Sequence, residues 1–299
     1  MDDTLDALIV GGGPAGLTGA IYLGRFRRRF VVVDAGDSRL NLIPCTRNHP
    51  GWPDGVAGPD LLGRIRAQAE RYGAQIVQGC VEALEKDGET FVAGLGDGSV
   101  IRARTVLLAS GVLDTEPKLP NFEQSIRQGL IRICPICDGY EVQGQAVGII
   151  GAGEKGAREA LFLRLYTDRL TLIHVGEAKT LPDRERRALA EAGIELIETP
   201  IGNVVVEQDR IAALDFGEGR LCRFDTLYSA LGSTSRSGLA EKLGAATDPA
   251  GCLQVSDHQE TAVPGLYAAG DLVRGLNQIS VAQGEAAIAA TDIHNRLRT

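Results

Sequence analysis

A glycine turn that occurs twice with the same spacing is the strongest constraint on how this chain can fold. The glycines are Gly11, Gly13 and Gly16 in the first turn and Gly151, Gly153 and Gly156 in the second. Each turn follows an apolar run, ALIVG or AVGIIG, and leads into a helical pattern of apolar residues. This order is typical of the strand, turn and helix that open a nucleotide-binding βαβ unit. The sequence therefore predicts that this unit is used twice.

Both predicted units continue in the same order. A second apolar strand follows (FVVVDAG or LTLIHVG), then a segment predicted to be antiparallel, and then a closing strand (TVLLASG or LYSALG). We predict an α/β fold of two Rossmann-like βαβ domains with three-layer architecture, each with an antiparallel β excursion. The 67 residues after LYSALG hold one predicted strand, GLYAAGD, and one long helical pattern. This is too little to bury a core alone, so they must return to one of the two units.

Charge and composition disfavour several classes of partner and location. The formal net charge is -8 and the sequence pI is about 5.2, so nucleic acid and anionic membranes would repel the chain. Residues 7–24 carry no charge, but acidic residues precede them and GGGPAG interrupts them. A signal peptide or a spanning helix would have neither feature. We predict a soluble, cytoplasmic protein with no nucleic-acid or membrane partner.

The first glycine turn has the features of a dinucleotide site. Its glycines allow a tight turn and the close approach of a pyrophosphate, and the start of the following helix favours negative charge. Asp34 lies 23 residues beyond Gly11, at the end of the second strand, where a ribose-binding carboxylate is expected. A glycine turn without a ligand is the alternative, but strand, turn, helix and acid occur here together.

The second turn lacks the acid. His174 lies 23 residues beyond Gly151, and Val175 and Gly176 offer no cation for a 2′-phosphate. The glycines of the second turn therefore define a candidate second nucleotide site without a clear ribose selector. An empty or repurposed site is the alternative.

Cys134 and Cys137 form a C-x-x-C pair just before the first strand of the second unit. A zinc site would need further ligands, but the remaining cysteines and histidines are scattered, so we expect no metal. A purely structural disulfide is disfavoured in the cytosol, which leaves a redox-active pair as the favoured interpretation. Asp138 would hinder thiolate formation by its charge, but it suits a group that exchanges protons when the disulfide opens. It could equally begin a turn with Gly139.

Taken together, these motifs resemble those of the low-molecular-weight thioredoxin reductases over nearly the whole chain. CPICDGYE matches the C-x-x-C-D-G-aromatic signature of that family, PGLYAAGD its second flavin motif, and NHPGW its Asn-x-Pro-Gly loop. The resemblance implies an FAD-dependent oxidoreductase that passes electrons between the flavin and the Cys134–Cys137 pair. It also implies that Cys137 faces the flavin and that Cys134 attacks the disulfide of the partner.

The resemblance further implies the domain limits and the cofactor-binding residues. Residues 1–115 and 245–299 would form the FAD-binding domain, and residues 116–244 an NAD(P)-binding-like domain that carries the C-x-x-C pair. The expected FAD-binding residues are Gly11, Gly13, Pro14, Ala15, Gly16, Asp34, Asn48, Gly111, Gly270, Asp271, Gln278 and Ile279. A thioredoxin-like protein or a small disulfide or dithiol is the implied partner, and a homodimer the implied assembly.

Two departures from the family leave the electron donor open. NADPH-dependent members carry a His-Arg-Arg run where this chain has HVGE, and an Arg-Gln-Ala pattern where it has NQIS. The donor could be NADPH or NADH, a second flavin, or ferredoxin. The alternatives to a reductase are an oxygen-using dithiol oxidase and a redox-sensing flavoprotein without turnover. Because flavin and dithiol are expected on different units, we predict that residues 112–120 and 235–250 act as hinges.

Overall fold

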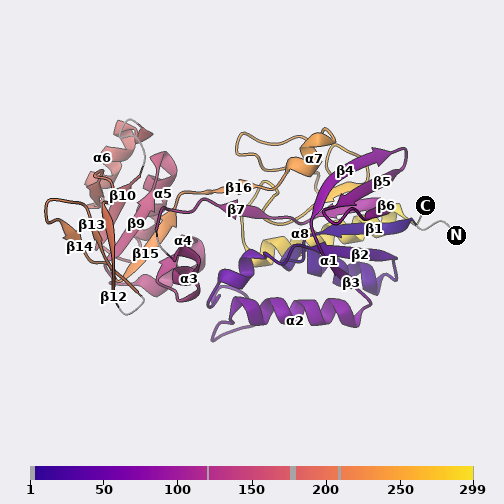
Figure 1. The fold of residues 1–299 in the computed structure, drawn as a ribbon, viewed down its shortest axis with the longest axis horizontal. Coiled ribbons are helices and arrows are strands. Elements are labelled where there is room, and N and C mark those ends of the chain that lie inside the picture. The colour runs from indigo at the N-terminus through magenta and orange to yellow at the C-terminus, as the bar shows by residue number, and fades with distance from the viewer. Residues whose placement is uncertain (1–3, 120, 176–179, 208–209, 299) are drawn as a thin grey trace.

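Two sheets, one in each βαβ unit, organise the chain (Figure 1); the second is parallel, and the first has parallel strands with the antiparallel strands β5 and β4 at one edge. The computed structural model describes residues 4–119, 121–175, 180–207 and 210–298. The first sheet has the order β3-β2-β1-β6-β5-β4, with β17 paired to β6. Its strands are β1 (Leu5–Val10), β2 (Phe30–Asp34), β3 (Gln75–Gln78), β4 (Val81–Asp87), β5 (Thr90–Leu95), β6 (Val100–Leu108) and β17 (Leu266–Ala268).

Both faces of the first sheet are covered, which gives the unit its three layers. The helices α1 (Pro14–Arg25), α2 (Gly58–Arg71) and α8 (Ile279–Arg296) share one apolar core with Ile9, Val32 and Leu107. The opposite face packs Leu8 and Val10 against the antiparallel strands β4 and β5 and the chain after residue 240. Residues that alternate along one strand thus enter opposite cores.

The second unit repeats this plan on a smaller scale. Its parallel sheet has the order β11-β10-β9-β15-β8. The strands are β8 (Ile131–Arg132), β9 (Val147–Gly151), β10 (Leu170–His174), β11 (Glu195–Ile197) and β15 (Thr226–Ala230). The helices are α3 (Phe122–Arg127), α4 (Pro135–Asp138), η2 (Gly139–Val142), α5 (Gly153–Leu163) and α6 (Asp183–Glu191). A separate antiparallel sheet consists of β12 (Asn203–Glu207), β13 (Arg210–Asp215) and β14 (Leu221–Cys222). The predicted fold class, with an antiparallel excursion in each unit, is confirmed.

The chain crosses between the units twice, and the two crossings pair with each other. β7 (Val112–Asp114) and β16 (Ser233–Ser235) run side by side as an antiparallel ribbon between the units (Figure 1). The first crossing lies within the predicted 112–120 hinge, of which residue 120 is outside the described residues. The second crossing overlaps the predicted 235–250 hinge only at Ser235, and the hinge range also contains the helix α7 (Gly238–Lys242).

The last part of the chain returns to the first unit. β17 extends the first sheet beside β6, and α8 packs along α1. Ala240 of α7 lies in the core of the first unit as well. The limits 1–115 with 245–299 and 116–244 remain a prediction, and the packing of α7 favours a second boundary near β16. Within the described residues, no helix combines the length and apolar character needed to cross a bilayer.

Candidate functional site

One large cavity brings together most of the residues singled out from the sequence. It has a volume of about 790 Å³ and lies between the first glycine turn, the Asn48 loop, the start of α8 and the C-x-x-C segment. The predicted residues that line it are Gly11, Gly13, Pro14, Ala15, Asp34, Asn48, Gly111, Cys134, Cys137, Asp138, Gly270, Asp271, Gln278 and Ile279. Gly16 and the three glycines of the second turn are not part of its wall.

The first glycine turn forms a cradle at one end of the cavity. Gly13 precedes α1, no side chain caps the helix, and Pro14 at its start has no N–H to satisfy. The other N–H groups of the first turn are therefore left for a ligand, as at an anion-binding helix start. Gly16 instead packs inward: a Cβ atom at this position would lie 1.9 Å from the Gly11 carbonyl oxygen.

Asp34 is buried at the end of β2, beside this cradle. Its Oδ1 atom accepts hydrogen bonds from the N–H groups of Gly12 (3.2 Å) and Gly36 (3.0 Å), and its Oδ2 atom pairs with Arg66. A carboxylate offers about four lone-pair positions, and these contacts use three. One acceptor position is thus left for a ribose hydroxyl, so the donor set of this end of the cavity fits an adenosine diphosphate group.

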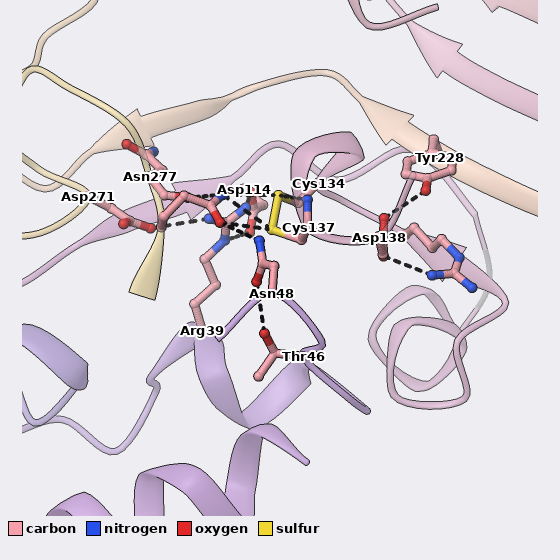
Figure 2. Close-up of a disulfide and its surroundings, with 12 residues drawn as sticks. Arg39, Thr46, Asn48, Asp114, Cys134, Cys137, Asp138, Tyr228, Asp271 and Asn277 are labelled. Carbon is pink, nitrogen blue, oxygen red and sulfur yellow. Dashed lines mark hydrogen bonds and ion pairs between the residues drawn. A yellow bond between two sulfur atoms is a disulfide. The ribbon is translucent and has the colours of Figure 1, made fainter. Parts of the chain in front are cut away.

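Cys134 and Cys137 form a disulfide at the other end of the cavity (Figure 2). Cys134 caps the short helix α4, and its sulfur accepts a hydrogen bond from the Cys137 N–H (3.2 Å). The Gln278 side-chain amide donates toward both sulfurs, at 3.4 Å from Cys137 and 3.6 Å from Cys134. A residue at the start of α8 in the first unit therefore contacts the redox pair of the second unit.

A chain of hydrogen bonds fixes the orientation of the Gln278 amide. Thr46 donates to the Asn48 Oδ1 atom (3.1 Å), and Asn48 Nδ2 donates to the Gln278 Oε1 atom (2.8 Å). Because the Gln278 oxygen is held by Asn48, its Nε2 atom lies on the side of the sulfurs, where it also donates to the Asn277 carbonyl oxygen (2.9 Å). The sequence predicted Asn48 and Gln278 as cofactor-binding residues, but it gave no sign of this contact between their side chains.

The Asp138 carboxylate faces away from the sulfurs, toward Tyr228 (Figure 2). The Tyr228 hydroxyl donates to its Oδ1 atom at 2.7 Å, and Arg132 pairs with its Oδ2 atom at 3.1 Å. Burial raises the pKa of the Asp138 carboxyl, while Arg132 and Tyr228 oppose this effect and Glu141 adds to it. Arg132 and Tyr228 were not identified from the sequence, because only the register of β8 and β15 brings them to Asp138.

Asp271 in the cavity wall is paired with Arg39, which also binds Asp114. Arg39 binds Asp114 through two hydrogen bonds (2.6 and 2.9 Å) and Asp271 through one (3.2 Å). Burial raises the pKa of the Asp271 carboxyl, Arg39 lowers it, and Asp114 raises it further. Arg39, which no sequence motif indicates, thus links the predicted cofactor residue Asp271 to the β7 crossing.

His174 occupies the position in the second turn that Asp34 holds in the first. It is buried, and its Nε2 atom accepts a hydrogen bond from the Gly153 N–H (3.2 Å) and lies 3.3 Å from the Thr180 hydroxyl. Burial lowers the pKa of His174, which favours the neutral ring. Arg186, a cation further along the chain, is paired with Glu198 at 2.6 Å. Among the described residues, no cluster of acidic, histidine or cysteine side chains could hold a metal.

Comparisons with known proteins agree with this arrangement. The family described as pyridine nucleotide-disulphide oxidoreductase matches residues 5–286. The chain is 31% identical to a thioredoxin reductase of Streptomyces coelicolor, over 98% of this chain and 94% of that protein. A thioredoxin reductase structure from Streptococcus pyogenes superposes with a TM-score of 0.90 at 25% identity, covering 100% of this chain and 99% of that one. The structure of HlmI superposes with a TM-score of 0.89 at 30% identity, covering 100% and 94%.

The fold and the disulfide site define a flavin disulfide oxidoreductase, an enzyme that passes electrons through a reactive cysteine pair. The description of the matched family names a pyridine nucleotide and a disulphide as its redox groups. The chain belongs to this pyridine nucleotide-disulphide oxidoreductase family and, within it, to the low-molecular-weight thioredoxin reductases.

Proposed function

We propose that this cavity binds FAD and that electrons pass between its flavin ring and the Cys134–Cys137 pair. The first glycine turn and Asp34 would hold the adenosine and pyrophosphate, and Asp271 the ribitol or a nearby phosphate. The start of α8, at Gln278 and Ile279, would face the pyrimidine edge of the ring, where the positive end of a helix suits the charge of the reduced form. When bound, FAD supplies two-electron chemistry that exchanges with a dithiol.

The observation that carries this proposal is the single cavity that ends at a glycine cradle on one side and at a disulfide on the other. The Gln278 contacts hold the sulfurs against the wall formed by α8. A protein disulfide would be the final partner, in a thioredoxin-like protein, or else a small-molecule disulfide or dithiol. The working assembly would be a homodimer, as implied by the resemblance.

We infer that the electron donor is not NADPH. The Gly153 N–H is already bonded to His174, whose neutral ring offers neither the carboxylate that binds a ribose nor the cation that binds a 2′-phosphate. Glu154 lies in the first turn of α5, where it competes with a phosphate for the positive end of the helix. NADH, reduced ferredoxin and a second flavin remain candidate donors.

An anaerobic titration of the FAD-loaded protein tests both the cofactor assignment and the donor assignment. NADPH, NADH and reduced ferredoxin are added separately while bleaching of the flavin absorbance is followed. We expect slow or no bleaching by NADPH and rapid bleaching by a different donor. Rapid and complete bleaching by NADPH would refute the donor assignment, and a colourless protein that cannot be reconstituted with FAD would refute the cofactor assignment.

The bonding of the second turn also favours a second candidate, a dithiol oxidase that uses oxygen. If no nicotinamide binds, electrons can reach the flavin only from another donor or from the disulfide side, as when a small dithiol reduces Cys134–Cys137. Oxygen would then accept two electrons and two protons and leave as hydrogen peroxide. Peroxide that forms in proportion to an oxidised dithiol in air would support this candidate, and its absence would favour the reductase.

A further inference from the structure

Asp138 lies in a set of charged and polar side chains that the C-x-x-C motif does not explain. Arg132 precedes the motif on β8, Tyr228 comes from β15, and Glu141 follows in η2. The Tyr228 side chain is fully buried, and its hydroxyl reaches the Asp138 carboxylate from a strand 90 residues further along the chain. A buried tyrosine hydroxyl needs a partner, and here that partner is the carboxylate next to the redox pair.

We propose that Tyr228 and Arg132 are positioning residues that hold Asp138 as the proton-exchanging group of the Cys134–Cys137 pair. This inference rests on the proposed function, because it assigns roles within the same disulfide site. One donor engages each carboxylate oxygen: the Tyr228 hydroxyl on Oδ1 and Arg132 on Oδ2. Both contacts favour the ionised carboxylate, which is the form that can accept a proton.

Thiol–disulfide exchange at the Cys134–Cys137 pair releases and takes up protons, so a nearby proton-exchanging group has a role. One thiol of the incoming dithiol loses its proton and attacks the Cys134 sulfur as a thiolate; the Cys134–Cys137 bond breaks, and its electron pair remains on Cys137 as a thiolate. The second substrate thiol loses its proton, attacks the mixed disulfide and releases Cys134 as a thiolate. The substrate leaves as a disulfide, the cysteine pair gains two electrons, and the two protons that the substrate releases go to the new cysteine thiolates, to Asp138 or to solvent. The Asp138 carboxylate lies toward Tyr228 and not toward the sulfurs, so it accepts one of these protons through solvent, and in the reverse direction it returns the proton by the same route.

The other charged groups around Asp138 define the sign of the effect. Burial and the neighbouring Glu141 favour the protonated form, while Arg132 and Tyr228 favour the anion. Removing either Arg132 or the Tyr228 hydroxyl therefore raises the pKa of Asp138, because one of the contacts that lower it is lost while burial and Glu141 still raise it. Asp138 then holds its proton to a higher pH, and the pH dependence of dithiol exchange moves in the same direction.

A direct test follows the Asp138 carboxyl by carbon NMR in oxidised protein labelled with ¹³C-aspartate, with Asp138→Asn used to assign the signal. We expect Tyr228→Phe to raise the titration midpoint by about one pH unit, roughly tenfold in proton affinity, because a hydrogen bond to a charged group is lost. Arg132→Gln should act in the same direction, and Arg132→Lys should restore part of the shift by keeping the charge.

The chain contains a matched control. Tyr267 is also fully buried, and its hydroxyl donates to Asp292 at 2.8 Å, in the first unit and outside the cavity wall. Tyr267→Phe removes the same kind of bond, so it should leave the Asp138 titration unchanged. An Asp138 midpoint that stays at its native value in both Tyr228→Phe and Arg132→Gln would overturn the proposal.

A second measurement separates this proposal from the proposed function. Anaerobic bleaching of the FAD-loaded protein by dithiothreitol is recorded against pH for the native protein and Tyr228→Phe, and the profile should shift with the NMR midpoint. Bleaching profiles that coincide despite a shifted midpoint would show that Asp138 does not exchange the proton and would overturn the proposal. A native protein that dithiothreitol never bleaches would instead refute the proposed function, while the NMR titration would still report on the Asp138 contacts.

Discussion

A single missing side chain allows the first helix to approach the first strand. Gly16 lies so close to the turn that a Cβ atom there would come within 1.9 Å of the Gly11 carbonyl oxygen. This oxygen belongs to the backbone of the cradle, so it cannot rotate away as a flexible side chain would. The third glycine of the motif therefore acts through packing, and the cavity depends on it although it does not line the wall.

Two glycine substitutions should accordingly have opposite effects on the free energy of unfolding. Gly16→Ala should lower it by about 1–3 kcal/mol or more through overpacking, and should weaken FAD retention. Gly63→Ala is the matched control, because Gly63 lies inside α2, is exposed, and has no atom within 4 Å of its added Cβ. It should raise the free energy of unfolding by about 0.5–1 kcal/mol. Urea unfolding checks both, and equal effects would contradict the packing argument.

At the scale of elements, β10 differs from β2 in the residue at its end. β2 ends in Asp34, whose carboxylate lies beside the first glycine turn, and β10 ends in the buried His174. Each accepts a hydrogen bond from a backbone N–H of its own glycine turn. The backbone pattern of the two units is thus preserved, while the chemistry at the strand end has changed.

His174 should make stability depend on pH. Burial lowers its pKa in the folded protein below the ordinary 6.5, so the unfolded chain binds the proton first as the pH falls. Stability is therefore full above about pH 6.5 and is lost below it, by up to about 1.4 kcal/mol per pH unit until the folded pKa is reached. His174→Gln should reduce the difference in the free energy of unfolding between pH 7.5 and pH 5.5, as measured by urea unfolding. An unchanged pH dependence in that variant would contradict the prediction.

At the scale of the whole molecule, the two units meet at the disulfide and, in the part of the chain that the structure describes, are joined by two chain crossings. Gln278 contacts the sulfurs, and Arg47 of the Asn48 loop lies 4.0 Å from Glu141 of the second unit. A flavin in the cavity and a protein partner would compete for the same sulfurs. The β7–β16 ribbon is therefore the place where we expect the units to turn.

A crosslink between the units should separate small from large substrates. Cysteines at positions 47 and 141 are joined by a bismaleimide in a background where Cys45, Cys80, Cys222 and Cys252 are serine. Bleaching by dithiothreitol should persist, whereas reoxidation of the photoreduced flavin by a thioredoxin disulfide should be lost because the units cannot turn. A crosslink between positions 186 and 198, within the second unit, is the control. Undiminished reoxidation in the 47–141 protein would refute the hinge.

The sequence predicts the features that depend on neighbours along the chain. The repeated strand, turn and helix, the two antiparallel excursions and the pairing of Cys134 with Cys137 all follow from local spacing, and the structure contains them. The contact of Tyr228 with Asp138 does not follow, because it depends on the strand order β9-β15-β8 and on the register of β15. The pairing of Arg39 with Asp114 and Asp271 likewise depends on tertiary packing.

The duplicated turns carry an evolutionary consequence. At the strand end that distinguishes them, one copy has aspartate and the other histidine, and codons for these two amino acids differ by a single base. The surrounding backbone already offers an N–H group to either side chain. A single point mutation would therefore give both halves the same acidic residue. Related genes that differ at this codon are the natural place to look for a change of electron donor.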